Sequence, residues 1–225
     1  MVKQRIKTQI AVCAFIFFIV LLMPVAGNAY RTISGNDIEL TCGQQNVAGK
    51  RILIIYDTKY GATRTIANTI QDVLCAAGAQ VDMSIVKRIQ NVSTYDAVIV
   101  GSAIISEQWR PDLVKFLKDQ EEILATKPVA VFIVCGLLKD DTPENREIAK
   151  KHYIDRVLQK IPMIIPVGNP GLFAGIMDYS VLTPLDEFLV RALFGRMLPE
   201  GDYRIFDKVT LWTDDIYALL RCFPC

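Results

Sequence analysis

The sequence contains one histidine, His152, and one Cys-x-x-C pair, "CFPC" at 222–225. A structural zinc site would need a second Cys-x-x-Cys pair or a nearby histidine, and neither accompanies this pair. A hydrolase needs a nucleophile next to a base, and no Ser/His/Asp set is recognisable. Lys and Arg are not clustered and the net charge is +1, which argues against nucleic-acid binding. Neither the Gly-x-x-x-x-Gly-Lys-Ser/Thr loop nor the Gly-x-Gly-x-x-Gly pattern is present.

The first 29 residues lack Asp and Glu. Lys3, Arg5 and Lys7 precede an uncharged apolar run at 10–26, and the small residues Gly27 and Ala29 follow it. This pattern predicts either a cleaved signal peptide or a retained membrane anchor within residues 1–29. The basic residues lie before the apolar run, so we expect an exported or membrane-anchored domain on the outer side of the cytoplasmic membrane, periplasmic in a bacterium. A cytoplasmic location is the alternative.

Five cysteines follow Cys13, and their odd number leaves at least one thiol unpaired within a monomer. They are Cys42, Cys75, Cys135, Cys222 and Cys225. The spacing of the C-terminal pair fits a redox dithiol, a metal half-site or a local disulfide. No second Cys-x-x-Cys accompanies it, which favours a structural or incidental role. His152 lies in the charged stretch "REIAKKHYIDR", which favours a solvated surface position over a catalytic base.

Beyond the N-terminal segment, the pattern predicts a polar linker at 30–49 and one domain at 50–225. Apolar runs typical of buried parallel strands occur at 51–56, 79–86, 95–102, 127–136 and within 163–176. Helical periodicity occurs between and after them, at 63–77, 111–124, 142–159 and 207–223. This alternation predicts an α/β fold with a doubly wound parallel sheet.

The turn after the first strand, "DTKYGATR" at 57–64, combines two threonine hydroxyls with a glycine at the start of a helix. In a doubly wound sheet, ligands bind beyond the carboxyl ends of the strands. Helix amides and hydroxyls at that position would suit a phosphate group. The alternative is an ordinary loop in which Thr63 caps the helix.

At this loop the chain resembles the flavodoxin-like family, whose phosphate loop has this Thr, Gly, Thr spacing. The resemblance continues through "YDAVIVGSAIISEQWRPDLVKFLK" and "VFIVCGL". Three later segments, "TPENREIAKKHYIDRVL", "GLFAGIMDYSVLTPLDEFLVRALFGRM" and "EGDYRIFDKVTLWTDDI", resemble the menaquinone-dependent protoporphyrinogen dehydrogenase branch. The resemblance implies a five-stranded parallel sheet of order 2-1-3-4-5, with a helical insertion before the last helix. It also implies FMN as cofactor.

The resemblance also implies the cofactor-binding residues. Thr58, Gly61, Ala62 and Thr63 would bind the FMN phosphate, with Lys59 and Tyr60 shaping the loop and Arg64 adding charge. Gly101, Ser102, Ala103 and Ile104 would face the flavin ring, and Cys135, Gly136 and Leu137 would lie along its other side. Electron-carrier flavodoxins stack aromatic residues on the ring. Here the nearby aromatics are Tyr60 and Trp109, and Trp109 has the alternative role of packing the following helix.

The insertion at 176–199 is rich in Leu, Phe, Val and Met at helical spacing. One interpretation is that it packs on the sheet edge. The other is that Phe188, Phe194 and Leu198 form an apolar platform for a quinone or the membrane, with Arg191 and Arg196 at lipid headgroups.

The sequence thus predicts an FMN-dependent oxidoreductase that passes electrons from an organic substrate to a quinone. One alternative is a membrane-tethered FMN-binding electron-transfer module without its own substrate. Another is a binding protein that has lost flavin. Electron carriers are usually strongly acidic, and the near-neutral charge of this chain argues against the first alternative. A quinone or redox partner is expected, and no nucleic acid.

Overall fold

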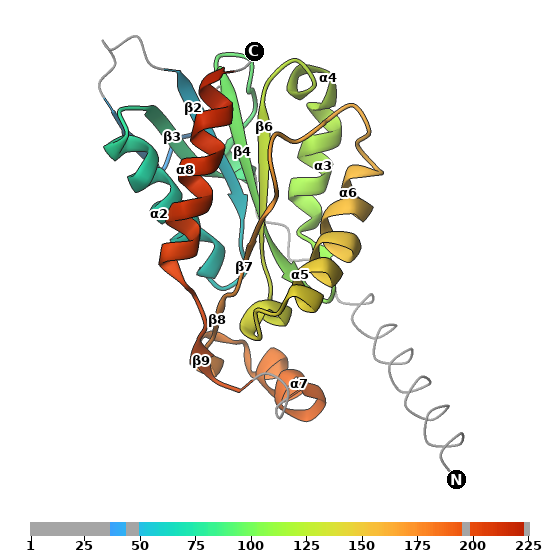
Figure 1. The fold of residues 1–225 in the computed structure, drawn as a ribbon. Helices are drawn as coiled ribbons and strands as arrows, with labels where there is room; N and C mark the ends of the chain where they lie inside the picture. Colours follow the sequence, from blue (N-terminus) through green and yellow to red (C-terminus); the bar gives the residue numbers. More distant parts are fainter. Residues whose placement is uncertain (1–36, 44–49, 195–198, 223–225) are drawn as a thin grey trace. The chain divides into compact units, whose positions relative to one another are not determined.

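The computed structural model describes residues 37–43, 50–194 and 199–222, and Figure 1 shows their fold. The predicted N-terminal segment at 1–29, residues 195–198 of the insertion and Cys225 lie outside this part. Within the described residues, no helix is both long enough and apolar enough to cross a membrane.

Five parallel strands form the central sheet, in the order β3-β2-β4-β6-β7. In chain order they are β2 (Arg51–Asp57), β3 (Gln80–Ile85), β4 (Ala97–Ile105), β6 (Val129–Val134) and β7 (Gly171–Phe173). Counted along the chain, this order is 2-1-3-4-5, which confirms the predicted doubly wound fold. The short strand β5 (Gln108–Trp109) pairs antiparallel with the end of β4.

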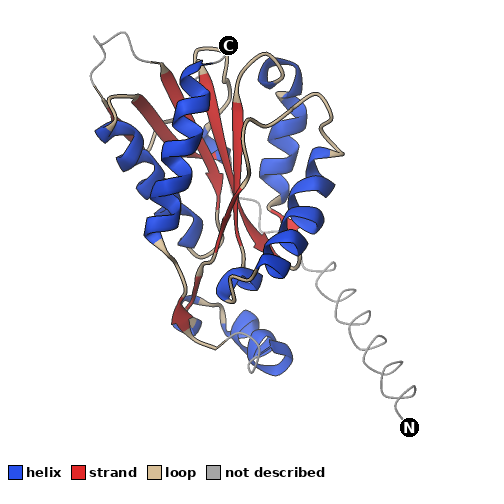
Figure 2. Cartoon of the chain, in the orientation of Figure 1, coloured by secondary structure: helices blue, strands red, loops and turns tan. Residues whose placement is uncertain are grey.

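Helices cover both faces of the sheet, as Figures 1 and 2 show. One face carries α2 (Ala62–Ala76) and α8 (Phe206–Cys222). The other carries α3 (Pro111–Asp119), α4 (Glu121–Leu124), α5 (Pro143–Ala149), a π-helix (Lys150–Asp155) and α6 (Arg156–Leu158). Successive strand residues point to opposite faces, so Ile52 and Ile54 pack under α2 and α8 while Leu53 and Ile55 pack on the α3 side. Burial on both sides explains why the strands are continuously apolar.

The insertion before the last helix is confirmed, and its described part contains a helix. The helix α7 (Pro184–Phe194) begins after Thr183, whose Oγ1 accepts a hydrogen bond from the Asp186 amide at 3.2 Å. Pro184 occupies the first-turn position, where its missing N–H is harmless. The short strands β8 (Ile176–Met177) and β9 (Gly201–Asp202) pair antiparallel at the base of the insertion.

Part of the segment assigned to the linker packs on the domain. The strand β1 (Leu40–Cys42) adds an antiparallel edge to β3, and Cys42 forms a disulfide with Cys75 of α2, with a Cα–Cα distance of 6.0 Å. Glu39 accepts a hydrogen bond from the Tyr56 hydroxyl at 2.7 Å. Residues 37–42 therefore belong structurally to the sheet.

Candidate functional site

Three of the segments singled out in the sequence meet at the carboxyl edge of the sheet. In the parallel register Asp57 of β2 lies beside Ser102 of β4, and Ala103 lies beside Val134 of β6. The chain therefore leaves β2 into residues 58–63, passes through 103–105 at the end of β4, and leaves β6 into 135–137, all at the same edge. The structure brings all thirteen predicted cofactor-binding residues to this region.

The loop after β2 is built around Gly61, whose φ of 90° lies in the left-handed region. Its amide donates to the Thr58 hydroxyl at 3.0 Å, and no described atom lies within 4 Å of a Cβ built on it. The helix α2 begins directly afterwards, at Ala62. Its first-turn amides are those that a helix leaves without an intrahelical acceptor. The loop thus presents free N–H groups beside an open space.

Thr63 is the most informative residue of this loop. The helix is capped by Gly61 without a side-chain hydrogen bond, so the alternative in which Thr63 is the N-cap is wrong. Thr63 lies inside the first turn, is fully buried, and its hydroxyl has no hydrogen-bond partner among the described residues. A buried hydroxyl without a partner is destabilising, which suggests that a ligand supplies the missing partner.

The two cations of the loop are already paired. Lys59 Nζ lies 2.8 Å from Asp186 of α7, and the Tyr60 hydroxyl donates to the same carboxylate at 2.8 Å. Burial favours neutral Lys59, but its hydrogen bonds to Asp186 and Tyr60 outweigh burial and raise its pKa. Arg64 forms an ion pair with Glu39 at 3.4 Å. A phosphate here would therefore be held mainly by amides and hydroxyls.

The end of β4 is tightly packed. Gly101 lies against the ring of Phe132, which a Cβ at this position would overlap. The buried Ser102 hydroxyl donates to the Ala103 carbonyl at 2.9 Å and accepts from the Arg110 amide at 3.0 Å. Ile104 is half-buried and pairs with Trp109 of β5.

A buried carboxylate, Asp57, lies behind these loops. It is 2% exposed, and its Oδ1 lies 3.6 Å from Arg110 Nε, while its Oδ2 has no hydrogen-bond partner in the described part of the chain. Burial raises the pKa of Asp57, and the charge of Arg110 opposes that shift. Asp57 therefore provides a titratable group at the end of β2, directly before the loop of residues 58–63.

The loop after β6 contributes backbone groups and the protonated thiol of Cys135 to this edge of the sheet. Cys135 is buried, its amide donates to the Phe173 carbonyl at 3.0 Å, and burial raises the pKa of its thiol to about 11. The thiol stays neutral at physiological pH, so Cys135 is not an activated nucleophile. Gly136 is exposed and Leu137 half-buried, and Asn145 Nδ2 donates to the Leu137 carbonyl at 3.4 Å.

Of the two aromatic candidates, Trp109 does not form an open stacking platform. Trp109 is 4% exposed and belongs to the core beneath α3, which confirms its packing role. Tyr60 is held through its hydroxyl to Asp186.

The insertion, in contrast, presents apolar side chains to solvent. Val181, Leu185 and Phe188 are 53%, 49% and 67% exposed, so these three side chains do not pack on the sheet edge. Arg191 lies 4.1 Å from the centre of the Tyr179 ring and forms an ion pair with Glu187.

Sequence reasoning missed Asp57, Arg110, Glu39 and Asp186. A charged residue closing an otherwise apolar strand could have marked Asp57. Asp186 accepts a hydrogen bond from Lys59, which lies more than a hundred residues earlier in the chain, and no local pattern indicates that contact.

A family model described as "Flavodoxin domain" matches residues 53–200. The chain belongs to the flavodoxin-domain family. It is 24% identical over 169 residues to an Escherichia coli (strain K12) protein named protoporphyrinogen IX dehydrogenase [quinone], covering 73% of this chain and 88% of that protein.

One solved structure agrees on the fold. A short-chain flavodoxin associated with a bacterial microcompartment has a TM-score of 0.50 at 11% identity, covering 76% of this chain and 99% of that one. A flavodoxin from the domain Archaea has a TM-score of 0.49 at 15% identity, covering 76% and 98%. The flavodoxin-domain assignment implies a flavin cofactor, and the partnerless Thr63 hydroxyl, the open space at Gly61 and the amides of α2 fit its phosphate.

Proposed function

We propose that the protein is an FMN-dependent oxidoreductase that passes electrons from an organic substrate to a quinone. The observation that carries this proposal is the buried Thr63 hydroxyl without a partner, next to the free first-turn amides of α2. Hydroxyl and amide donors at a helix N-terminus are suited to a phosphate group. When bound, FMN would supply the acceptance of two electrons and their delivery to the quinone.

The residues of this chain would hold and orient the cofactor. Thr58, Gly61, Ala62 and Thr63 form the phosphate cradle, with Lys59 and Tyr60 fixed by Asp186 at its rim. The segments 101–104 and 135–137 would lie along the ring. Gly101 permits close packing of β4 against the buried Phe132 ring of β6, because it has no Cβ.

The quinone-linked activity is supported by the name of the Escherichia coli relative and by the insertion. That relative is named as a quinone-linked protoporphyrinogen IX dehydrogenase. The exposed Val181, Leu185 and Phe188 give the insertion an apolar surface that a quinone or a membrane would cover.

The proposal extends to location: an exported or membrane-anchored protein with its domain on the outer side of the membrane. The pattern at 1–29 supports it, and so does the Cys42–Cys75 disulfide, since disulfides persist mainly in oxidising compartments. Mass spectrometry of thiol-blocked protein from intact cells would show this pair oxidised. A fully alkylated pair would contradict the proposed location.

The test uses the full-length protein. Its visible spectrum with and without added FMN shows whether it binds flavin, and steady-state reduction of a quinone analogue by protoporphyrinogen shows whether it turns over. A yellow protein with turnover supports the proposal. A yellow protein without turnover favours the tethered electron-transfer module, and a protein that stays colourless with added FMN favours the binding-only alternative.

A further inference from the structure

We infer that Asp186 is a positioning residue: it docks the insertion onto the loop of residues 58–63 and thereby orders that loop for the flavin phosphate. The two segments lie far apart in the sequence and meet through this one side chain. The inference rests on the proposed function for the identity of the ligand. The ordering of the loop by Asp186 can be measured without any ligand.

One carboxylate oxygen joins the insertion to the loop. Asp186 Oδ2 accepts hydrogen bonds from Lys59 Nζ at 2.8 Å and from the Tyr60 hydroxyl at 2.8 Å. The Thr183 hydroxyl donates a third bond to the same oxygen, also at 2.8 Å. Because Thr183 holds the carboxylate on its own helix, the carboxylate can orient both loop residues.

The contact is ionic and only partly screened by water. Burial opposes ionisation of Asp186, but its hydrogen bonds with Lys59, Thr183 and Tyr60 outweigh burial and lower its pKa. The side chains of Lys59 and Asp186 are 35% and 28% exposed. A hydrogen bond between two charged groups is stronger than one between neutral groups, so this contact is the firmest link between the two segments.

The loop needs such a link, because its own structure restrains residues 59 and 60 weakly. They precede Gly61, whose φ is 90° and beside which a Cβ would meet open space. Glycine is the residue whose conformation costs the most entropy to fix. Within the described part of the chain, Lys59 and Tyr60 bond through their side chains to Asp186, and Lys59 Nζ lies 5.0 Å from the centre of the Tyr60 ring.

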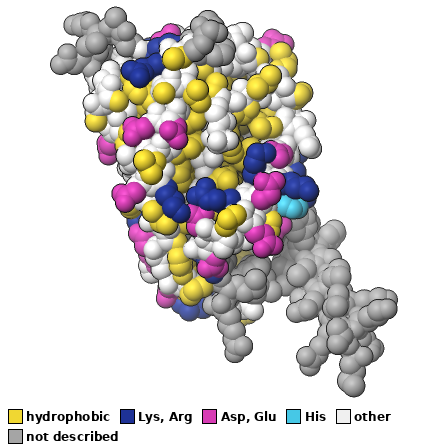
Figure 3. All heavy atoms as spheres, viewed as in Figure 1, with side chains coloured by type: hydrophobic (Ala, Val, Ile, Leu, Met, Phe, Trp, Pro, Cys, Tyr) yellow, Lys and Arg dark blue, Asp and Glu magenta, His cyan; other side chains and the backbone are white. Residues whose placement is uncertain are grey.

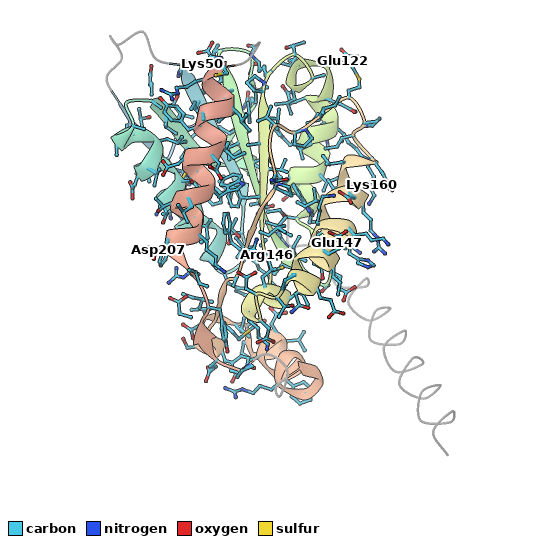
Figure 4. The ribbon with its side chains drawn as sticks, viewed as in Figure 1. Lys50, Glu122, Arg146, Glu147, Lys160 and Asp207 are labelled. Atoms are coloured by element: carbon cyan, nitrogen blue, oxygen red, sulfur yellow. A yellow bond between two sulfur atoms is a disulfide. The ribbon has the colours of Figure 1, made fainter. Side chains whose placement is uncertain are left out.

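The insertion projects from the end of the domain at which the parallel strands finish. Figure 1 shows α7 beyond this edge of the sheet. Figure 4 shows the insertion beyond Arg146 and Asp207, at the opposite end of the domain from Lys50. Figure 3 shows hydrophobic side chains at the surface of this end. A segment that projects in this way needs a specific contact to hold it against the loop.

Asp186 provides that contact for α7. Leu185 and Phe188 are exposed, and Arg191 pairs with Glu187 of the same helix. Among the described side chains of α7, the hydrogen bonds and ion pairs to the rest of the domain all end on Asp186. Loss of this carboxylate should therefore loosen the helix and the loop together.

Two opposing effects decide how docking changes phosphate binding. Asp186 occupies the charge of Lys59, and releasing a partly exposed ion pair changes an equilibrium constant by about fivefold at most. Fixing the backbone of a single residue costs about five- to thirtyfold, and Asp186 restrains both Lys59 and Tyr60. Ordering therefore outweighs the occupied cation, and the docked insertion favours phosphate binding. By reciprocity, phosphate binding favours the docked insertion.

The test measures flavin binding to the full-length protein by calorimetry. Asp186→Ala should weaken FMN binding about five- to thirtyfold and leave riboflavin, which has no phosphate, unchanged. Tyr60→Phe removes only a hydroxyl and should weaken FMN about two- to tenfold. Glu187→Ala is the matched control, because Glu187 is the next residue of the same helix and pairs with Arg191. This control should leave the FMN affinity unchanged.

Amide hydrogen exchange gives a second readout, which a merely structural role of Asp186 would not produce. FMN should slow exchange across 184–194 in the wild type and in Glu187→Ala, and should leave it unchanged in Asp186→Ala. Unchanged or tighter FMN binding by Asp186→Ala, or an equal loss of riboflavin affinity, would overturn the inference.

Exchange in the flavin-free protein separates this inference from the proposed function. There Asp186→Ala should speed amide exchange at residues 59–63, and Glu187→Ala should not. Faster exchange in a protein that does not bind FMN would refute the proposed function and retain the ordering of the loop by Asp186. Normal FMN binding with unaltered exchange at 59–63 would refute the inference alone.

Discussion

Thr63→Val should separate the effect on the cofactor from the effect on the folded chain. Valine has nearly the shape of threonine and lacks the hydroxyl that has no partner in the structure. If the hydroxyl donates to the FMN phosphate, its loss removes a hydrogen bond to a charged group, worth about 1.5–3 kcal/mol. The dissociation constant for FMN should then rise about 10- to 150-fold.

The same substitution should not destabilise the flavin-free protein. It removes a buried polar group that has no partner, so the free energy of unfolding without FMN should stay constant or increase. At an FMN concentration of about 100 times the wild-type Kd, bound cofactor stabilises the wild type by about 2.7 kcal/mol, and a variant with 100-fold weaker binding gains only about 0.4 kcal/mol. For a domain of this size the FMN-induced rise in Tm should fall from about 5–10 °C to about 1 °C.

The assay is a thermal-shift series with FMN and with riboflavin, which has the same ring and no phosphate. Thr63→Val should weaken FMN and leave riboflavin unchanged. Thr69→Val is the control, because Thr69 lies in the same helix and its hydroxyl already donates to the Thr65 carbonyl at 3.2 Å. Equal weakening of both flavins, or a lower Tm of the flavin-free variant, would refute the assignment of Thr63 to the phosphate.

Three further perturbations test the structure around the site. Gly101→Ala places a methyl group against the Phe132 ring and should lower the free energy of unfolding by about 1–3 kcal/mol in urea titrations; an unchanged midpoint would contradict the packing. Burial raises the pKa of Asp57 above its ordinary 3.8, so its contribution to stability is present below that pH and is lost as pH rises through the higher folded value. Asp57→Asn should flatten this part of the stability–pH curve, and an unaltered slope would exclude the residue as its source. Replacing Cys42 and Cys75 by Ser opens a loop with a sequence separation of 33 and should lower stability by about 3–4 kcal/mol, whereas equal stability of reduced and oxidised wild type would argue against the bond.

The sequence was sufficient to predict the sheet, because the apolar patterns of its strands and helices are local. Continuous apolar runs such as 51–56 are buried on both faces, and Gly78, with a φ of 88°, ends the helix that follows the first run. Right-handed crossovers then give a doubly wound sheet, and the strand order 2-1-3-4-5 was implied by the resemblance to the flavodoxin-like family. The position of the phosphate loop follows in turn, since it comes directly after the first parallel strand.

The sequence was insufficient where the contacts are distant and polar. The segment at 37–42 has little apolar periodicity, and its place in the sheet depends on pairing with β3 and on the disulfide to Cys75. Asp186 reaches Lys59 and Tyr60 across the fold. The helical spacing at 176–199 did not indicate where the helix starts, which Pro184 and the Thr183 hydroxyl set. Such contacts depend on how two distant segments meet in the fold. The sequence of one segment alone does not show this.

The distribution of unsatisfied polar groups gives an independent indication of the site. In the described part of the chain, seven residues each have a buried side-chain atom without a hydrogen-bond partner. Four of them, Asp57, Thr63, Trp109 and Arg110, adjoin the carboxyl ends of β2 and β4. Buried polar atoms are almost always paired in native proteins, because leaving one unpaired costs about 1–3 kcal/mol. The other three, Arg51, Asn68 and Gln120, lie apart from one another, at the start of β2, in α2 and between α3 and α4. Asp57 and Arg110 still form an ion pair with each other at 3.6 Å, so the fully buried Thr63 hydroxyl is the atom at this edge that a missing ligand explains best. Because this argument uses neither the loop spacing nor the family match, it supports a ligand site at this edge even if the spacing of 58–63 proves uninformative.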